Sequence, residues 1–234
     1  MYNALFGNIT DAEKNSAVEN IIQHATPRKD FFLMLALSVS MAAFGILLGS
    51  NIILIGSMLI APLLYPLISL SLGIIMSDSN LVGRSVITFV KSVIYALIAG
   101  FVIGLLFSGS STVSLPFTQT TTGGASLMYA VVAAIAGFAA AFAVTKPHLN
   151  ETLPGVAISV ALVPPLAEAG IALSSLEMTA FSNSILLLLV NVIGVVFSAM
   201  IVFALLRFST KKTVAEKVVK EEDKTVAQEE SKTE

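Results

Sequence analysis

The chain has 234 residues, of which 56% are hydrophobic and only 12% are charged, and its mean hydropathy is +0.89. This composition excludes an ordinary soluble domain, because so few charged side chains could not solvate its surface, and it predicts a polytopic membrane protein. A net charge of −2 without a dense basic cluster argues against nucleic acid as a partner. The absence of cysteine excludes disulfides, thiolate metal sites and cysteine nucleophiles.

The first 30 residues predict an amphipathic juxtamembrane helix. Thr10 and Glu13 have the spacing of a capping box, and Pro27 is expected to end the helix. A frayed polar leader is the alternative. The segment has no continuous apolar core, so it does not resemble a signal peptide. The apolar stripe of the predicted helix consists of Val18, Ile21, Ile22 and Ala25.

Six apolar segments follow, each near the ~20 residues that cross ~30 Å of hydrocarbon. They form two triplets, within 31–107 and 126–206, separated by an uncharged connection at 108–125 that is rich in Ser, Thr and Gly. The charged tail, 207–234, is expected to be a solvated helix or disordered. The predicted segments are 31–50, 51–77, 85–107, 126–145, 153–176 and 181–206.

Proline interrupts the middle segment of each triplet. Residues 59–63 read L-I-A-P-L with Pro66 beyond them, and residues 162–166 read L-V-P-P-L. Proline lacks an amide donor and clashes with the carbonyl one turn earlier, so we expect both helices to be discontinuous at Pro62, Pro66, Pro164 and Pro165. A simple kink is the alternative. Lipid cannot satisfy the freed backbone groups, so each break must face protein or a polar cavity.

The three-plus-three arrangement predicts inverted repeats, because an odd number of spans brings the second unit in from the opposite face. Paired interruptions in two such halves are typical of transporters with a site near the bilayer midplane. The predicted fold class is therefore an all-α membrane protein of six spans in two inverted triplets.

Basic residues predict the orientation. Apart from Lys91, every Lys and Arg lies in 1–30, 78–84, 146–152 or 207–234, which would all face the cytoplasm. Lys91 could reach the same side by extending its side chain. We expect a multi-pass protein of the cell membrane with both termini cytoplasmic and with 108–125 and 177–180 external.

Glu168 is the acidic residue farthest from the ends of the apolar segments. An ionised carboxylate at that depth costs at least ~2.5–3.5 kcal/mol on insertion scales, so it requires a partner, water or a proton. It could bind a proton or cation and couple binding to movement, or it could only cap a half-helix. In the alignment of the two halves its counterpart is Tyr65. The weaker polar candidates are Ser57, Asn51 and Asn191.

Residues 55–66, I-G-S-M-L-I-A-P-L-L-Y-P, resemble the signature I-G-A-M-L-[IV]-[AS]-P-L-M-x-P of an uncharacterised hydrophobic family, domain of unknown function 389. Residues 153–166 resemble its second signature, and the resemblance covers roughly 27–206. The chain departs from the pattern at Ser57 and at Leu64 and Tyr65. The resemblance implies an integral membrane protein of prokaryotic type and supplies no activity.

Two functions fit these patterns. The favoured one is transport or channel-like permeation of a small solute or ion through a site at the two breaks. The alternative is a membrane scaffold or sensor that acts through its termini. We expect no enzyme activity, catalytic residue, cofactor or metal, because no histidine lies within an apolar segment to activate a serine. Small residues at Gly45, Gly49, Gly100 and Gly104 suit close helix packing, within one chain or in a homo-oligomer.

Overall fold

The computed structural model describes residues 9–107, 124–146, 149 and 153–231, and in these residues every regular element is a helix. The all-α fold class is therefore confirmed. Most of the predicted external connection at 108–125 and most of the 146–152 connection lie outside the described residues. The helices are α2 (Asp11–Ala25), α3 (Lys29–Leu47), α4 (Asn51–Met58), α5 (Leu64–Met76), α6 (Ser79–Phe107), α7 (Gly124–Val144), α8 (Leu153–Ser174), α9 (Met178–Leu205), the short 3-10 helix η2 (Phe208–Lys211) and α10 (Lys212–Ser231).

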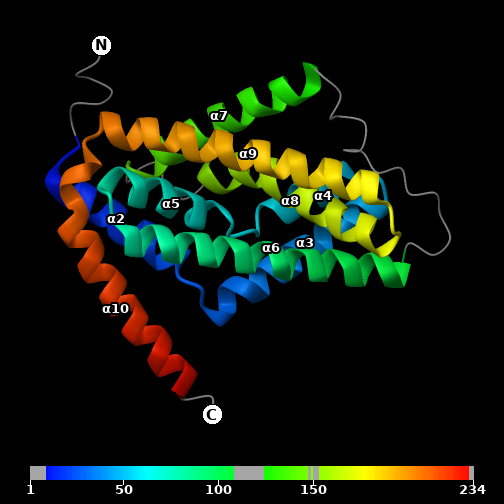
Figure 1. The fold of residues 1–234 in the computed structure, drawn as a ribbon, viewed down its shortest axis with the longest axis horizontal. Coiled ribbons are helices and arrows are strands. Elements are labelled where there is room, and N and C mark those ends of the chain that lie inside the picture. The colour runs from blue at the N-terminus through cyan, green and yellow to red at the C-terminus, as the bar shows by residue number, and fades with distance from the viewer. Residues whose placement is uncertain (1–8, 108–123, 147–148, 150–152, 232–234) are drawn as a thin grey trace.

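The apolar helices α3 to α9 form one elongated bundle, with α2 and α10 at the same end (Figure 1). Helix α8 is its central element and packs against α3, α6, α7 and α9. All of its side chains from 162 to 172 are buried. The α6–α8 contact is close because Gly100 and Gly170 face each other, and Gly137 of α7 meets α9 in the same way.

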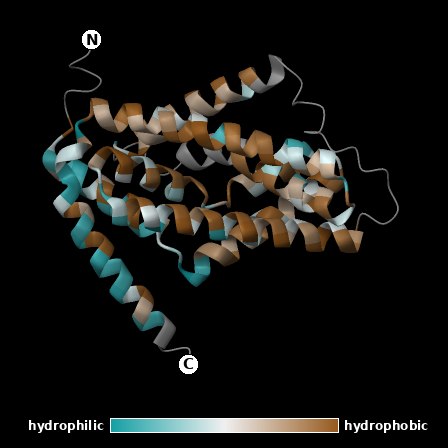
Figure 2. Ribbon diagram, in the orientation of Figure 1, coloured by the Kyte–Doolittle hydropathy of each residue, from teal (hydrophilic) through white to brown (hydrophobic). Residues whose placement is uncertain are grey.

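Within the described residues, four helices are long and apolar enough to cross a membrane by length and composition: α3, α6, the 127–144 part of α7, and α9. Helix α5 and residues 162–174 of α8 are shorter apolar helices. Large hydrophobic side chains are exposed along the outside, among them Ile94 and Leu105 of α6 and Ile193 and Phe197 of α9, and apolar colour dominates the bundle in Figure 2. A soluble monomer rarely exposes apolar surface on this scale, whereas lipid covers it. The chain is therefore membrane-embedded.

The prediction that α8 is broken at Pro164 and Pro165 is wrong, because α8 is one helix that contains both prolines. Neighbouring helices surround this part of α8. Inside a packed bundle, neighbouring groups and small local adjustments can compensate the two missing amide donors. The predicted pair of broken helices is thus reduced to one interruption, between α4 and α5.

The capping box predicted at Thr10 is confirmed. The Thr10 side chain accepts a hydrogen bond from the Glu13 amide at 3.2 Å, and the Glu13 carboxylate accepts from the Thr10 amide at 2.6 Å. The apolar stripe of α2 is buried against the bundle. The charged tail forms the helix α10, which is one of the two predicted alternatives.

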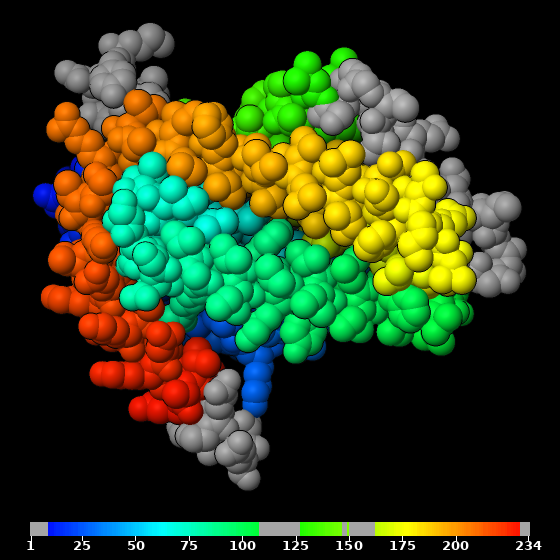
Figure 3. Space-filling model, in the orientation of Figure 1, coloured from blue at the N-terminus to red at the C-terminus, as the bar shows by residue number. Residues whose placement is uncertain are grey.

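Helix α10 is not solvated on every side. It packs against α2 and the start of α6 and buries Ala215, Val218 and Val219, and Figure 3 shows it at one end of the bundle. An ion pair of 2.8 Å between Lys211 and Asp11 links the tail to α2. The hydrophilic residues gather at this end (Figure 2).

Candidate functional site

The interruption between α4 and α5 lies midway along the bundle (Figure 1). Helix α4 ends in a tightened turn, in which the amides of Leu59 and Ile60 donate to carbonyls three residues earlier, at 3.3 and 3.2 Å. Pro62 has no amide and disfavours helical backbone at the residue before it, so the chain leaves the helix there. Pro66 falls in the first turn of α5, where no amide partner is required.

Serine side chains attach both halves of the interrupted helix to the bundle. The Ser38 hydroxyl of α3 donates to the Ser57 carbonyl at 2.7 Å, one turn before the break. In α5, Ser71 donates to the Val196 carbonyl of α9 at 3.3 Å, and Ser69 accepts from Ser85 of α6 at 2.9 Å. These bonds hold short helices that have few backbone hydrogen bonds of their own.

A cavity of about 620 Å³ opens beside the break. Its apolar part comes from the break and α3, and its polar part from the end of α2 and from α10. Its wall contains an ion pair between Arg28 and Glu222 at 2.7 Å, in which the Glu222 side chain is only 9% exposed. The cavity is lined by Gln23, His24, Thr26, Arg28, Asp30, Phe31, Met34, Ile60, Pro62 and Glu222.

Tyr65 lies near this cavity. Its ring stacks on that of His24, with the centroids 4.6 Å apart and the planes at 24°. His24 itself lines the cavity, and its Nδ1 lies 2.9 Å from the Asn20 carbonyl oxygen. Two of the predicted residues, Pro62 and Tyr65, therefore lie close to a histidine that was not predicted to belong to the site.

Ser57 is fully buried, and its hydroxyl donates to the Leu54 carbonyl at 2.6 Å. Asn51 is exposed at the first position of α4, two turns before the break, so it does not reach the break. Asn191 is buried in α9 with 2% exposure. Of these weaker candidates, Ser57 is the one whose backbone contacts lie directly beside the interruption.

Glu168 has no exposed surface. The backbone of Ala167, the preceding residue of α8, lies against Gly100 of α6. Successive residues of a helix are rotated by about 100°, so Glu168 points away from this line of contact. Glu168 is thus carried by the central helix and is enclosed by the bundle. Its position one turn beyond Pro164 keeps it near the middle of the apolar sequence, as predicted from its distance to the segment ends.

His24, Arg28 and Glu222 were not among the residues predicted from the sequence. Arg28 and Glu222 are 194 residues apart in the chain, so no local pattern could pair them. The apolar stripe of α2 was the sequence feature that could have indicated His24, because it predicts that this helix packs on the bundle. In the structure α2 packs on α5 and brings His24 onto the Tyr65 ring.

The helices, their exposed apolar surface and the buried polar groups between them define an α-helical integral membrane protein. The family described as "Domain of unknown function (DUF389)" matches residues 58–197, and the chain belongs to this family. It is 32% identical over 176 residues to an uncharacterized protein of Methanocaldococcus jannaschii, a match that covers 75% of this chain and 54% of that protein. The chain thus spans about half the length of the curated relative it matches. No solved structure matches it.

Proposed function

We propose that the chain is a secondary transporter or channel-like permease for a small solute or ion. It would act at the break between α4 and α5, with Glu168 as the group that binds a proton or cation. The observation that carries the proposal is the complete burial of this carboxylate in the central helix of a membrane bundle. Ionisable groups at such depth are costly and are typical of ion pathways and proton relays.

The interrupted helix adds a second argument. A helix that ends inside a membrane leaves amide and carbonyl groups at its two ends, with a partial positive charge at the start of α5. No side chain caps the start of α5. The cavity beside Pro62 would give a solute access to these groups from the end of the bundle that carries both described terminal helices.

The proposal includes six crossings, formed by α3, the α4–α5 pair, α6, α7, α8 and α9. The positions of Lys and Arg support cytoplasmic termini in the cell membrane. The two triplets would still be related as inverted repeats, although only the first has an interrupted middle helix.

The alternative function, a scaffold or sensor, has one specific observation in its favour. Helix α10 packs on α2, and two ion pairs join the ends of the chain, Lys211 of η2 with Asp11 of α2 and Glu222 of α10 with Arg28 before α3. A partner that binds these terminal helices could compete for the same charged groups.

Flux measurements in proteoliposomes separate the two functions. Across a panel of monovalent ions, protons and small metabolites, we expect flux in the native protein and loss of its pH or cation dependence in Glu168→Gln, which keeps the shape but removes the titratable charge. The matched control is Glu177→Gln, because Glu177 is exposed and makes no side-chain cap at the start of α9. Absence of flux for the whole panel, or unchanged ion dependence in a folded Glu168→Gln protein, would contradict the proposal.

A further inference from the structure

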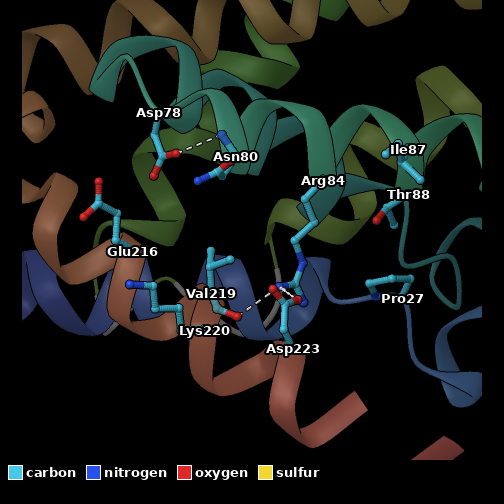
Figure 4. A pocket seen from close by; sticks show the side chains of 10 residues that line it. All are labelled: Pro27, Asp78, Asn80, Arg84, Ile87, Thr88, Glu216, Val219, Lys220 and Asp223. Atoms are coloured by element: carbon cyan, nitrogen blue, oxygen red, sulfur yellow. Dashed lines mark hydrogen bonds and ion pairs between the residues drawn. The ribbon is translucent and has the colours of Figure 1, made fainter. Parts of the chain in front are cut away.

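A second cavity, of about 630 Å³, lies between the start of α6, helix α10 and the segment after α2 (Figure 4). It is separate from the break and contains none of the residues proposed above for transport. Its lining combines charged and apolar side chains: Pro27, Asp78, Asn80, Arg84, Ile87, Thr88, Glu216, Val219, Lys220 and Asp223.

Asp78 provides the main evidence for a ligand. One carboxylate oxygen, Oδ1, caps α6 by accepting from the amides of Asn80 at 3.0 Å and Leu81 at 3.2 Å. The residue is only 3% exposed, and among the described residues its other oxygen, Oδ2, is buried without a hydrogen-bond partner. A buried carboxylate oxygen without a donor is strongly unfavourable, so this oxygen requires a proton, water or a bound cation.

Of the basic side chains around Asp78, Lys220 also lines the cavity but makes no hydrogen bond to Asp78 Oδ2, and two others are engaged elsewhere. Arg84 donates to the Val219 carbonyl at 3.2 Å and to Thr26 Oγ1 at 3.0 Å, and it pairs with Asp223. The ammonium of Lys212 donates to the Ser77 carbonyl at 2.9 Å. Neither contact satisfies Asp78 Oδ2, so the cavity retains an acceptor for a cationic donor.

Figure 4 shows Glu216 and Lys220 at the same end of the cavity as Asp78, with the Arg84–Asp223 pair farther along. Besides that pair, the lining carries two carboxylates and one ammonium, a net charge of −1. A second buried oxygen, Thr88 Oγ1, also has no hydrogen-bond partner among the described residues and lines the cavity. The cavity therefore favours a ligand with one positive charge and further polar groups.

We propose that this cavity binds a primary ammonium group, held by Asp78 Oδ2 and the Glu216 carboxylate. A primary ammonium has three donors and no acceptor, which suits the carboxylates and the Asn80 amide oxygen at that end. The part of the chain that the structure describes has no cluster of three or more His, Cys, Asp or Glu that could hold a metal ion. The volume fits an organic molecule, and Ile87, Val219 and Pro27 form apolar walls for its carbon skeleton.

Two sources could supply this group: a free alkylamine or the headgroup of an aminophospholipid. Ile87 is 57% exposed on α6 and lies among other exposed apolar side chains, Val86, Val90 and Ile94, so the cavity borders surface that lipid covers. Both sources offer the same ammonium donors to Asp78.

The test measures binding to the full chain in detergent micelles by thermal stability and calorimetry at pH 7 and constant ionic strength. In the first arm the probe is n-butylamine, with n-butanol as neutral isostere and tetramethylammonium as a cation without N–H donors. In the second arm the probe is dihexanoyl phosphatidylethanolamine, compared with dihexanoyl phosphatidylcholine. We expect butylamine or the phosphatidylethanolamine to bind, and a response restricted to the lipid would identify the headgroup as the source.

Two substitutions test the residues. Asp78→Asn keeps the helix cap, since Asn is an equally good N-cap residue, and should weaken binding roughly tenfold or more because the buried charge partner is lost. Glu216 is exposed on α10, so Glu216→Gln should leave the fold of the bundle intact. It should weaken binding about threefold, as expected for the loss of an exposed charge. The control, Glu221→Gln, is exposed on α10 and does not line the cavity.

Equal binding of butanol or tetramethylammonium would overturn the proposal, as would unchanged affinity in both Asp78→Asn and Glu216→Gln. Absence of binding in both arms would overturn it as well. None of these results depends on whether the protein transports a solute.

Discussion

Substitution of Gly170 by alanine tests whether the close contact between α6 and α8 fixes the central helix. A Cβ atom at position 170 would lie 2.7 Å from the Gly100 Cα atom and 2.8 Å from the Gly100 carbonyl carbon and the Phe101 nitrogen. All three are backbone atoms of α6, so no side chain can turn away to make room. The two helices would have to move apart.

The expected magnitude follows from two opposing effects. Overpacking of a well-packed interior costs about 1–3 kcal/mol, whereas alanine is favoured over glycine in a helix by about 0.8–1.0 kcal/mol. Because the clash involves backbone, we expect overpacking to dominate and Gly170→Ala to lose about 1–2 kcal/mol of unfolding free energy, a factor of about 5 to 30 in the folded-to-unfolded ratio.

Gly83→Ala is the control, since a Cβ atom there meets nothing within 4 Å and Gly83 lies on α6, the helix that Gly170 of α8 contacts. It should keep or raise stability by up to about 1 kcal/mol, through helix propensity alone. Gly100→Ala should fall between the two, because its Cβ atom would lie 3.0 Å from the Ala167 carbonyl oxygen and 3.1 Å from Gly170 Cα.

The assay is reversible unfolding in bicelles or mixed micelles, with helix content as the folding control. If Gly170→Ala were as stable as Gly83→Ala, the described contact between α6 and α8 would be wrong. Glu168 lies two residues from Gly170, so a displaced α8 should also alter the ion dependence of any flux measured with Glu168 intact.

Three further predictions concern the ends of the chain. Glu222→Gln should weaken the docking of α10 by about 1 kcal/mol of free energy, since the partner Arg28 is partly exposed. Amide exchange should then be faster in α10 and unchanged in α6. Unchanged exchange in α10 would argue against the ion pair. A hydrogen bond and charge from Lys211 lower the pKa of Asp11 below its ordinary 3.8. A lowered acid pKa stabilises the folded state above the unfolded value and loses this effect as pH falls through the lowered one. The difference in α2 amide exchange between the native chain and Lys211→Ala should therefore stay constant from pH 7 to about 5 and vanish at pH values below the lowered pKa. Finally, Ser175 and Thr210 are exposed in a chain without native cysteine, so single cysteines there can report the topology. A cysteine at Ser175 should react with an impermeant reagent in intact cells, and a cysteine at Thr210 should react only after permeabilisation. The reverse pattern would show that the topology is inverted.

Hydrophobic pattern and helix-end chemistry predicted the local structure well. The six apolar segments coincide with α3, the α4–α5 pair and α6 to α9, because a long apolar run in lipid must form a helix to satisfy its own backbone. Thr10 and Glu13 predicted the start of α2 through contacts three residues apart, which the sequence displays directly.

Long-range pairing was beyond the same reasoning. Arg84 and Asp223 are 139 residues apart, and the tail carries charges of both signs that would suit a solvated helix equally well. Only the fold shows that Val219 and Glu222 lie on the packed face of α10. The partly satisfied carboxylate of Asp78 could not be predicted either, because an acidic residue at a helix start is ordinarily a complete cap.

The different outcome at the two proline motifs has a physical explanation. In the first, Pro62 and Pro66 are four residues apart, so a new helix can start between them with Pro66 in a turn that requires no amide, and α5 begins at Leu64. In the second, Pro164 and Pro165 are adjacent, and a restart would place several unpaired groups in the most buried part of the bundle. Packing on all sides of α8 favours the continuous helix instead. In the proposed function the two halves would therefore act differently: α8 would hold Glu168 in a fixed central position, and the interrupted α4–α5 segment would be the part that adjusts around a solute.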